Sequence, residues 1–103
     1  MPTIRRMVLF KIPSEVDQQK LLGMYKEMPT RALKNGKSYI LSVEAGTTQQ
    51  DSRAQGYTIA ATSVFRDQED FDYYDVDCKA HGELKAFARS VNEGMCMVRI
   101  VVD

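Results

Sequence analysis

The first third of the chain passes from a strand-like to a helix-like hydrophobic pattern. Residues 3–12 carry apolar side chains on both faces of an extended segment, which is typical of a strand covered on both sides. An apolar stripe at helical spacing follows over 15–33, and Ser14 is the expected N-cap residue. Proline lacks an amide donor, so we expect Pro29 to end or kink this helix near Met28.

The rest of the chain contains three more strand patterns and two more helix patterns. The expected strands and helices cover residues 38–46, 57–65, 68–74, 79–91 and 95–102. The polar segment 47–56 is expected to be a loop. Asp67 and Asp77 are candidate N-cap residues for the two helices, and Gly94 is expected to supply a left-handed conformation after the second.

In chain order these elements predict a β-α-β-β-α-β unit. This is an α+β, ferredoxin-like arrangement with a four-stranded antiparallel sheet, and we expect a single domain over residues 1–103. Two helices cover only one face of such a sheet, whereas the predicted strands are apolar on both faces. We therefore expect a second copy of the chain to cover the other face, in a homodimer whose two sheets form an α/β barrel.

Composition limits the classes of partner. The chain has 14 acidic and 14 basic residues, so no basic surplus supports nucleic-acid binding. No apolar run approaches the roughly 20 residues of a membrane-spanning helix. The N-terminus lacks a signal-peptide pattern, and Cys78 and Cys96 lie in unlike contexts, so we expect a reduced, cytoplasmic protein. One histidine and no clustered cysteines make a zinc site improbable.

Residues 71–87 concentrate the side chains that can perform chemistry. The segment holds the single histidine, His81, early in a predicted helix. The positive end of the helix dipole favours a neutral imidazole there, which can act as a general base. Asp77, four residues earlier, has the opposite effect on charge and is a candidate to orient the ring. The alternative is a helix-terminal histidine that binds only backbone or solvent.

Tyr73 and Tyr74 form the second candidate pair. Adjacent residues diverge by about 100° on a helix, so one of the two is expected to face the same interior as His81. A phenol there can bind a carbonyl and stabilise an enolate. The alternative is that these tyrosines only pack in the core, and packing is the favoured interpretation for at least one of the two. Three more residues are candidates for lining a cavity: Tyr25, Met28 and Tyr39. For each of them, packing in the core or the sheet is the favoured interpretation.

Two arginines lie within otherwise apolar strands. Arg6 and Arg99 each need an acidic partner or an anionic ligand if they are half-buried. Glu44 and Glu93 are candidate partners, and an ion pair is the favoured interpretation. The alternative for Arg6 is recognition of a substrate carboxylate or enolate.

An acidic cluster precedes His81 but does not match a calcium-binding loop. We expect no metal site there and interpret the cluster as a solvated face with helix caps. Its members are Glu69, Asp70, Asp72, Asp75 and Asp77.

With these observations in hand, the chain resembles the stress-responsive dimeric α/β-barrel (Dabb) family, and fungal members in particular. The resemblance spans roughly residues 4–102 and is carried by residues 7–11, 53–57, 71–74 and 80–81. It implies a ferredoxin-like subunit and a dimeric barrel. Some relatives are polyketide cyclases that close an aromatic ring without a cofactor, using a histidine that matches His81 and a tyrosine about six residues before it.

The chain departs from that family pattern at three places. Tyr74 lies seven residues before His81, residues 77–79 replace the usual His-Pro, and Arg6 stands at a strand position that is often histidine.

Two functions follow. The first is a cofactor-free enzyme for a hydrophobic or aromatic small molecule, a polyketide-type cyclase or lyase with His81 as general acid or base. The second is a non-catalytic, stress-responsive or small-molecule-binding homodimer.

Overall fold

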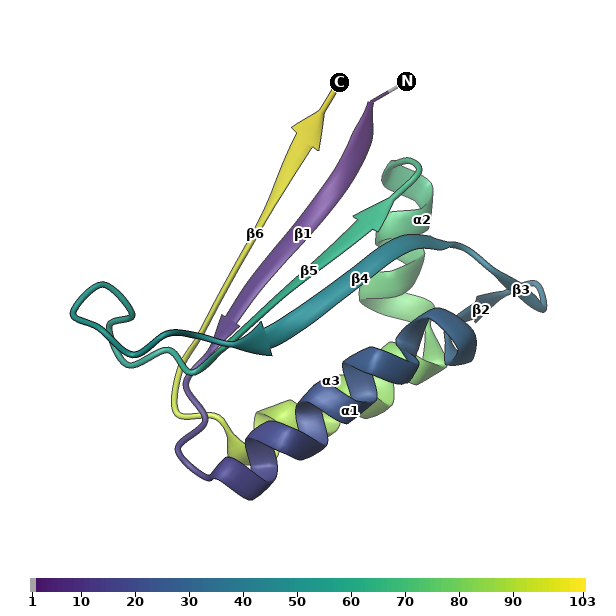
Figure 1. Ribbon diagram of the computed structural model, residues 1–103. Coiled ribbons are helices and arrows are strands. Elements are labelled where there is room, and N and C mark those ends of the chain that lie inside the picture. The colour runs from purple at the N-terminus through teal and green to yellow at the C-terminus, as the bar shows by residue number, and fades with distance from the viewer. Residues whose placement is uncertain (1) are drawn as a thin grey trace.

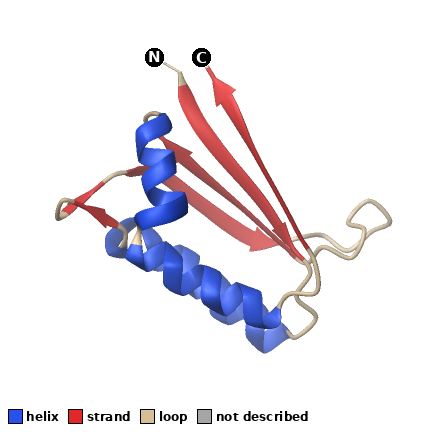
Figure 2. Cartoon of the chain, turned by 180° about the vertical axis from the view of Figure 1, so that it is seen from behind, coloured by secondary structure: helices blue, strands red, loops and turns tan. Residues whose placement is uncertain are grey.

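A computed structural model describes residues 2–103 of the chain. Four antiparallel strands form one sheet in the order β4-β5-β1-β6 (Figure 1). The strands of this sheet are β1 (Thr3–Phe10), β4 (Ile40–Thr47), β5 (Ile59–Phe65) and β6 (Met95–Val102). Helices α1 and α3 lie side by side along one face (Figures 1 and 2). This is the predicted β-α-β-β-α-β, ferredoxin-like arrangement.

The helical and minor elements follow the predicted order, with one added element. The helices are α1 (Glu15–Arg31), α2 (Gln68–Asp72), the π-helical turn η1 (Tyr73–Asp77) and α3 (Lys79–Val91). A small hairpin, which the sequence did not predict, joins α1 to the sheet and consists of β2 (Leu33–Lys34) and β3 (Lys37–Ser38). Its turn is made by Asn35 and Gly36, both at positive φ, a conformation that glycine adopts without strain.

Helix α1 begins as predicted, and it ends between Met28 and residue 33, the two limits that the sequence indicated. The Ser14 hydroxyl accepts a hydrogen bond from the Asp17 amide at 3.4 Å, which caps the first turn. Of the two effects expected of Pro29, an end or a kink near Met28, the end does not occur there, because the helix continues to Arg31. Pro29 lies in the last turn, and the amide of the C-cap residue Ala32 donates to the Met28 carbonyl at 2.9 Å.

The core lies between the helices and one face of the sheet. Alternate residues of β1 and β5 point to that face and are buried, as the two-residue period of a strand requires. Leu21 and Tyr25 of α1 pack into the same layer and are almost fully buried. The other sheet face carries exposed apolar side chains, among them Met7 and Val98, which pair across β1 and β6.

The acidic cluster is only partly a solvated face. Asp67 caps α2 by accepting the Asp70 amide at 2.9 Å, as predicted. Asp70 itself is buried, and its carboxylate pairs with Lys34 at 2.8 Å and with Arg66 at 3.1 Å. This carboxylate therefore connects α2 to the hairpin.

No helix within residues 2–103 is long and apolar enough to cross a membrane.

Replacing Leu21 with alanine tests how α1 is held to the sheet. Leu21 is fully buried, so Leu21→Ala should lower the free energy of unfolding by about 3 kcal/mol through lost burial and a residual cavity. Leu33→Ala is the matched control, since Leu33 on β2 is 43% exposed and should cost less than about 1 kcal/mol. Urea unfolding measures both. Equal losses would contradict this packing.

Candidate functional site

A cavity of about 130 Å³ lies between the sheet and α3, on the helix-covered side of the sheet. Strand β1 contributes two side chains, α1 contributes Tyr25, and one face of α3 forms most of the remaining wall. The lining residues are Arg6, Phe10, Tyr25, His81, Leu84, Lys85, Ala88, Arg89, Asn92 and Met95. The cavity thus combines an apolar wall with a small set of polar groups, as small-molecule sites do.

His81 is fully buried, and one of its ring nitrogens is fixed. Its Nδ1 lies 2.7 Å from the backbone carbonyl oxygen of Tyr74. A carbonyl can only accept a hydrogen bond, so Nδ1 carries the proton of the neutral imidazole. The lone pair is therefore on Nε2, which has no hydrogen-bond partner within residues 2–103. His81 is held as a neutral base with its accepting nitrogen free.

The π-helical turn explains why the Tyr74 carbonyl is available. The Cys78 amide donates to the Tyr73 carbonyl at 2.8 Å, an i to i+5 bond, and does not take the Tyr74 carbonyl as an α-turn would. The freed carbonyls of Tyr74 and Asp75 accept from His81 and Lys85, which lie one turn apart on α3. The wider turn holds one residue more than an α-turn, which accommodates the seven-residue spacing between Tyr74 and His81.

Tyr74 packs against His81 and lies behind it as seen from the cavity. The two rings are stacked, with centroids 3.7 Å apart and planes at 13°. Tyr74 is fully buried, contacts Phe65 and is not among the lining residues. Its ring and its backbone oxygen thus fix the position of the imidazole from two directions.

Arg6 is buried without an acidic partner. Only 4% of the residue is exposed, and among residues 2–103 no carboxylate pairs with its guanidinium. Its Nε makes no hydrogen bond, and its Cζ lies 5.7 Å from the centroid of the Tyr74 ring. The expected ion pair with Glu44 or Glu93 was wrong for Arg6. Arg99 instead lies over the ring of Phe71 at 5.2 Å.

Register explains the missing ion pair. Arg6 pairs across the sheet with Ser63, and Ser63 pairs with Val43. Residues opposite each other share a face, so Glu44, next to Val43, points to the other side of the sheet.

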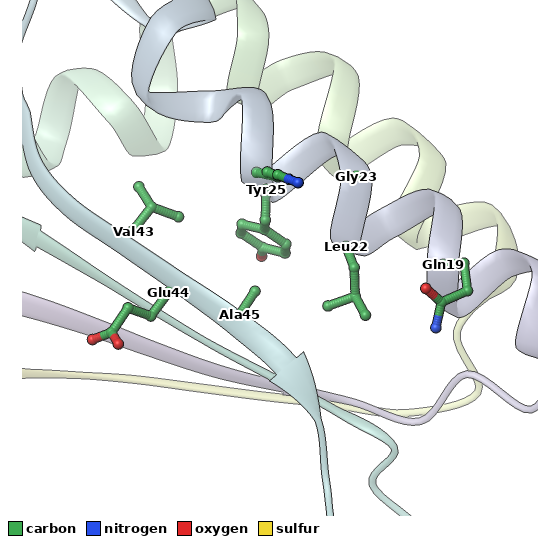
Figure 3. A pocket seen from close by; sticks show the side chains of 8 residues that line it. Gln19, Leu22, Gly23, Tyr25, Val43, Glu44 and Ala45 are labelled. Carbon is green, nitrogen blue, oxygen red and sulfur yellow. The ribbon is translucent and has the colours of Figure 1, made fainter.

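Tyr25 stands between the cavity and an open groove on the surface. The groove, about 510 Å³, lies between α1 and β4, and Figure 3 shows Tyr25 projecting from α1 toward the sheet among Leu22, Val43 and Ala45. The same residue lines the inner cavity. Its phenol is buried and makes no hydrogen bond, although Arg6 is close enough to affect its ionisation. Tyr25 is the phenol that a ligand in the cavity would meet.

Burial determines the charge states at the site. It lowers the pKa of His81 to about 3, and the neighbouring Arg6 charge adds to the effect, while the bond to the Tyr74 carbonyl opposes it. Burial also raises the pKa of Tyr25 to about 12, against the influence of Arg6, and raises the pKa of Tyr74. At neutral pH the cavity therefore presents a neutral imidazole, a neutral phenol and a guanidinium cation.

The structure brings together some of the predicted site residues and separates others. His81, Tyr25 and Arg6 line the cavity, with Tyr74 directly behind His81. The remaining three lie elsewhere. Tyr73 donates its hydroxyl to the Leu33 carbonyl at 2.9 Å, Tyr39 stacks edge-on against Tyr73 at 5.2 Å, and Met28 is a buried core residue.

Sequence reasoning missed Lys85 and Arg89 as lining residues. They follow His81 at spacings of four and eight on α3, so they lie on nearly the same side of the helix. That spacing was visible in the sequence. Asp77 does not orient His81, because Asp77 is exposed and the Tyr74 carbonyl binds the imidazole instead. Asp77 also does not cap α3, because the N-cap residue of that helix is Cys78.

The cysteines, Gly94 and the possible metal ligands can also be compared with the expectations from sequence. Cys78 and Cys96 are both free thiols, one buried and one exposed. Gly94 does not adopt the left-handed conformation, because positive φ among the glycines of residues 2–103 is confined to Gly36 and Gly56. Within the same residues, no three histidine, cysteine or acidic side chains are grouped as metal ligands would be.

Known proteins of similar sequence and structure can now be compared with this site. The model of the stress responsive A/B barrel domain, Dabb, matches residues 4–103. A Gibberella zeae protein described as a fusaristatin A biosynthesis cluster protein is 36% identical over 96 residues, which cover 92% of this chain and 70% of that protein.

Solved structures share the fold at low sequence identity. A hydroxynitrile lyase from Passiflora edulis has a TM-score of 0.81 at 17% identity, covering 98% of this chain and 94% of that one. A dimeric ferredoxin-like protein from Thermobifida fusca has a TM-score of 0.80 at 13% identity, with coverages of 98% and 92%. A Dabb family protein from Mesorhizobium loti has a TM-score of 0.70 at 18% identity, with coverages of 97% and 96%.

The sequence match covers nearly all of the chain, and the same sheet and helices recur in these structures. The chain therefore belongs to the stress responsive A/B barrel domain (Dabb) family.

Proposed function

We propose that this protein is a cofactor-free enzyme that moves a proton on a small carbonyl compound, as a polyketide-type cyclase or a lyase does. His81 is its general base and acid. The observation that carries the proposal is the buried Nε2 of His81, unprotonated and unpartnered, beside a cavity that Tyr25 and Arg6 also line. The expected ligand is hydrophobic or aromatic, in keeping with the wall formed by Phe10 and Leu84.

The proposed cycle begins when Nε2 of His81 accepts a proton from the carbon next to a substrate carbonyl. The electron pair of that C–H bond forms an enolate, whose oxygen accepts a hydrogen bond from the Tyr25 phenol. In a cyclase the enolate carbon attacks a second carbonyl, and His81 returns its proton to the new alkoxide. In a lyase Nε2 accepts a hydroxyl proton, the carbon–carbon bond breaks, and His81 protonates the departing carbanion.

The remaining predicted site residues take different parts in this scheme. Tyr74 is a positioning residue, because its ring stacks on His81 and its carbonyl fixes the tautomer. Arg6 is a substrate-binding residue that faces an oxygen of the ligand. Tyr73, Tyr39 and Met28 have no contact with the cavity and are assigned to packing.

Two of the similar proteins support an enzymatic role. The Gibberella zeae relative is named for a biosynthesis cluster, and the Passiflora edulis protein is a hydroxynitrile lyase.

The second candidate is a non-catalytic, stress-responsive or small-molecule-binding protein, and the small volume of the cavity, about 130 Å³, favours it. The two candidates differ in whether His81 moves a proton.

We also propose that the protein is a homodimer joined through the outer sheet faces. Met7 and Val98 lie on that face, beside a shallow apolar groove of about 170 Å³ that runs over β1, β5 and β6. Monomeric proteins rarely leave a large contiguous apolar surface in contact with water. The Thermobifida fusca protein, which shares the fold, is described as dimeric.

Proton exchange tests the catalytic role of His81. The protein should speed the exchange of the methyl protons of acetophenone in D₂O, followed by proton NMR, or the cleavage of mandelonitrile to benzaldehyde. His81→Gln should lower the rate by at least about 100-fold because it removes the base. Tyr25→Phe should also lower it, whereas Tyr73→Phe removes a phenol outside the cavity and should leave it unchanged. Full activity in His81→Gln would contradict the proposal, and inactivity of the folded wild type towards both compounds would favour the binding protein.

The dependence of stability on pH tests the neutral state of His81. Unfolding frees a histidine with an ordinary pKa near 6.5, whereas the pKa of folded His81 is about 3. Between these values the unfolded chain binds the extra proton, so stability is full above pH 6.5 and falls as pH is lowered. We expect the free energy of unfolding to drop by about 1 kcal/mol from pH 7 to pH 5.5. His81→Gln should lack this drop in urea titrations; the same drop in both proteins would contradict the assignment.

A pair of valine substitutions tests the dimer. Val98→Asp places a charge on the outer sheet face and should give a monomer by sedimentation velocity. Val76→Asp is the matched control, because Val76 is exposed on the π-helical turn, away from that face. A dimeric Val98→Asp protein, or a monomeric wild type, would contradict the interface.

A further inference from the structure

Three cationic side chains line the cavity, and no acidic side chain within residues 2–103 does so. Arg6 is buried at the inner end, Lys85 is half-buried, and Arg89 is exposed. The chain as a whole has equal numbers of acidic and basic residues. The excess of positive charge at the cavity is therefore local, because the chain as a whole has no excess of basic residues.

The buried guanidinium is the strongest part of this pattern. Removing a cation from water is unfavourable unless an opposite charge or hydrogen bonds replace the water. Arg6 has no carboxylate partner within residues 2–103, and its Nε makes no hydrogen bond. A ligand with an anionic oxygen would supply what is missing.

A second arginine adds to the positive charge at Arg6. Arg99 of β6 lies directly opposite Arg6 of β1 in the sheet register, so both side chains are on the same face. Like charges directly opposite each other in a sheet are destabilising. The guanidinium of Arg99 lies over Phe71 and has no acidic partner among the described residues, but the side chain is exposed, so water screens its charge.

The rest of the lining defines the body of the ligand. Phe10, Leu84, Ala88 and Met95 contribute apolar surface, and Tyr25 offers one phenol hydrogen next to Arg6. An apolar cavity of about 150 Å³ is large enough to hold benzene, so a volume of about 130 Å³ suits one ring or a short chain.

We propose that the ligand of this cavity is a small apolar or aromatic carboxylate whose anionic oxygens pair with Arg6. This inference rests on the proposed function, because it names the class of substrate on which His81 acts. Lys85 and Arg89 extend the positive charge to the surface and attract the anion towards the cavity. A guanidinium binds a carboxylate through two parallel hydrogen bonds, which fixes the orientation of the ligand as well as its charge.

Ligand binding would also change the base. The titratable or charged groups around His81 are Arg6 from β1, Tyr25 from α1, Tyr74 from the π-helical turn and Lys85 from α3. The charges of Arg6 and Lys85 both disfavour a proton on His81. A carboxylate that neutralises Arg6 removes part of this effect, so a bound acid makes His81 a stronger base than a bound neutral ligand does.

Calorimetric binding of benzoate and benzamide tests the inference. The two compounds have nearly the same size and shape and differ in charge. We expect wild-type protein to bind benzoate at least tenfold more tightly than benzamide. Arg6→Met should lose this preference, whereas Arg6→Lys, which keeps the charge, should retain part of it. Equal binding of both probes, an unchanged preference in Arg6→Met, or no benzoate binding up to about 10 mM would overturn the inference.

A surface variant keeps the test decisive if Arg6→Met does not fold. Arg89→Ala should weaken benzoate binding about two- to threefold at low salt and less at high salt, because exposed charges are screened. Arg53→Ala is the matched control, since Arg53 is equally a surface arginine but lies in the loop after β4. Equal effects of the two variants would contradict the role of the cavity charges.

Failure of this inference is distinguishable from failure of the proposed function. Benzoate binding requires no turnover, so His81→Gln should keep the preference for benzoate while losing proton exchange. A wild type that prefers benzoate but moves no proton would overturn only the enzymatic role. A wild type that exchanges acetophenone protons but binds both probes equally would overturn only the carboxylate assignment.

Discussion

The hydrogen bond from Nδ1 of His81 to the carbonyl oxygen of Tyr74 is the interaction on which the site depends. It fixes the tautomer, and it leaves Nε2 as the accepting nitrogen. The bond exists because the π-helical turn sends the Cys78 amide to Tyr73 and leaves the Tyr74 carbonyl free. Wide turns of this kind are rare and are found frequently at functional sites. Here one extra residue in a turn determines which nitrogen can act as a base.

The second constraint is electrostatic. A neutral histidine and an unpaired arginine line the same cavity, and the charge of the arginine helps to keep the histidine neutral. When no ligand is bound, such a site disfavours a second proton on His81. Negative charge that enters or develops beside Arg6 would make the protonated form of His81 less unfavourable. In the proposed site the charge of Arg6 thus affects His81, and a ligand that pairs with Arg6 would change the basicity of His81.

The fold was predictable from sequence because its signals are local and repeated. Alternating strands, an amphipathic α3 and the capping residue Ser14 each indicated an element, and the order of elements indicated the topology. His81 was identifiable because it is the only histidine. Helix α1 continues past Pro29 to Arg31, since a proline in the last turn removes only one hydrogen bond and the Ala32 amide still donates to the Met28 carbonyl.

The arrangement inside the site was not predictable in the same way. Which tyrosine meets His81 depends on the π-helical turn, a departure from the 3.6-residue period on which the prediction rested. The part proposed for Tyr25 depends on how α1 packs against the sheet. The missing partner of Arg6 depends on strand register, because Val43 shares the face of Arg6 and its neighbour Glu44 therefore points to the opposite face.

The most direct test of this account is the NMR titration of the imidazole of His81, whose signals are unambiguous because the chain contains one histidine. Long-range ¹H–¹⁵N spectra report which ring nitrogen carries the proton and at what pH the second nitrogen gains one. The account predicts a neutral ring with its proton on Nδ1 throughout the range from pH 7 to pH 5. A proton on Nε2, or a ring that titrates near its ordinary pKa of about 6.5, would contradict it.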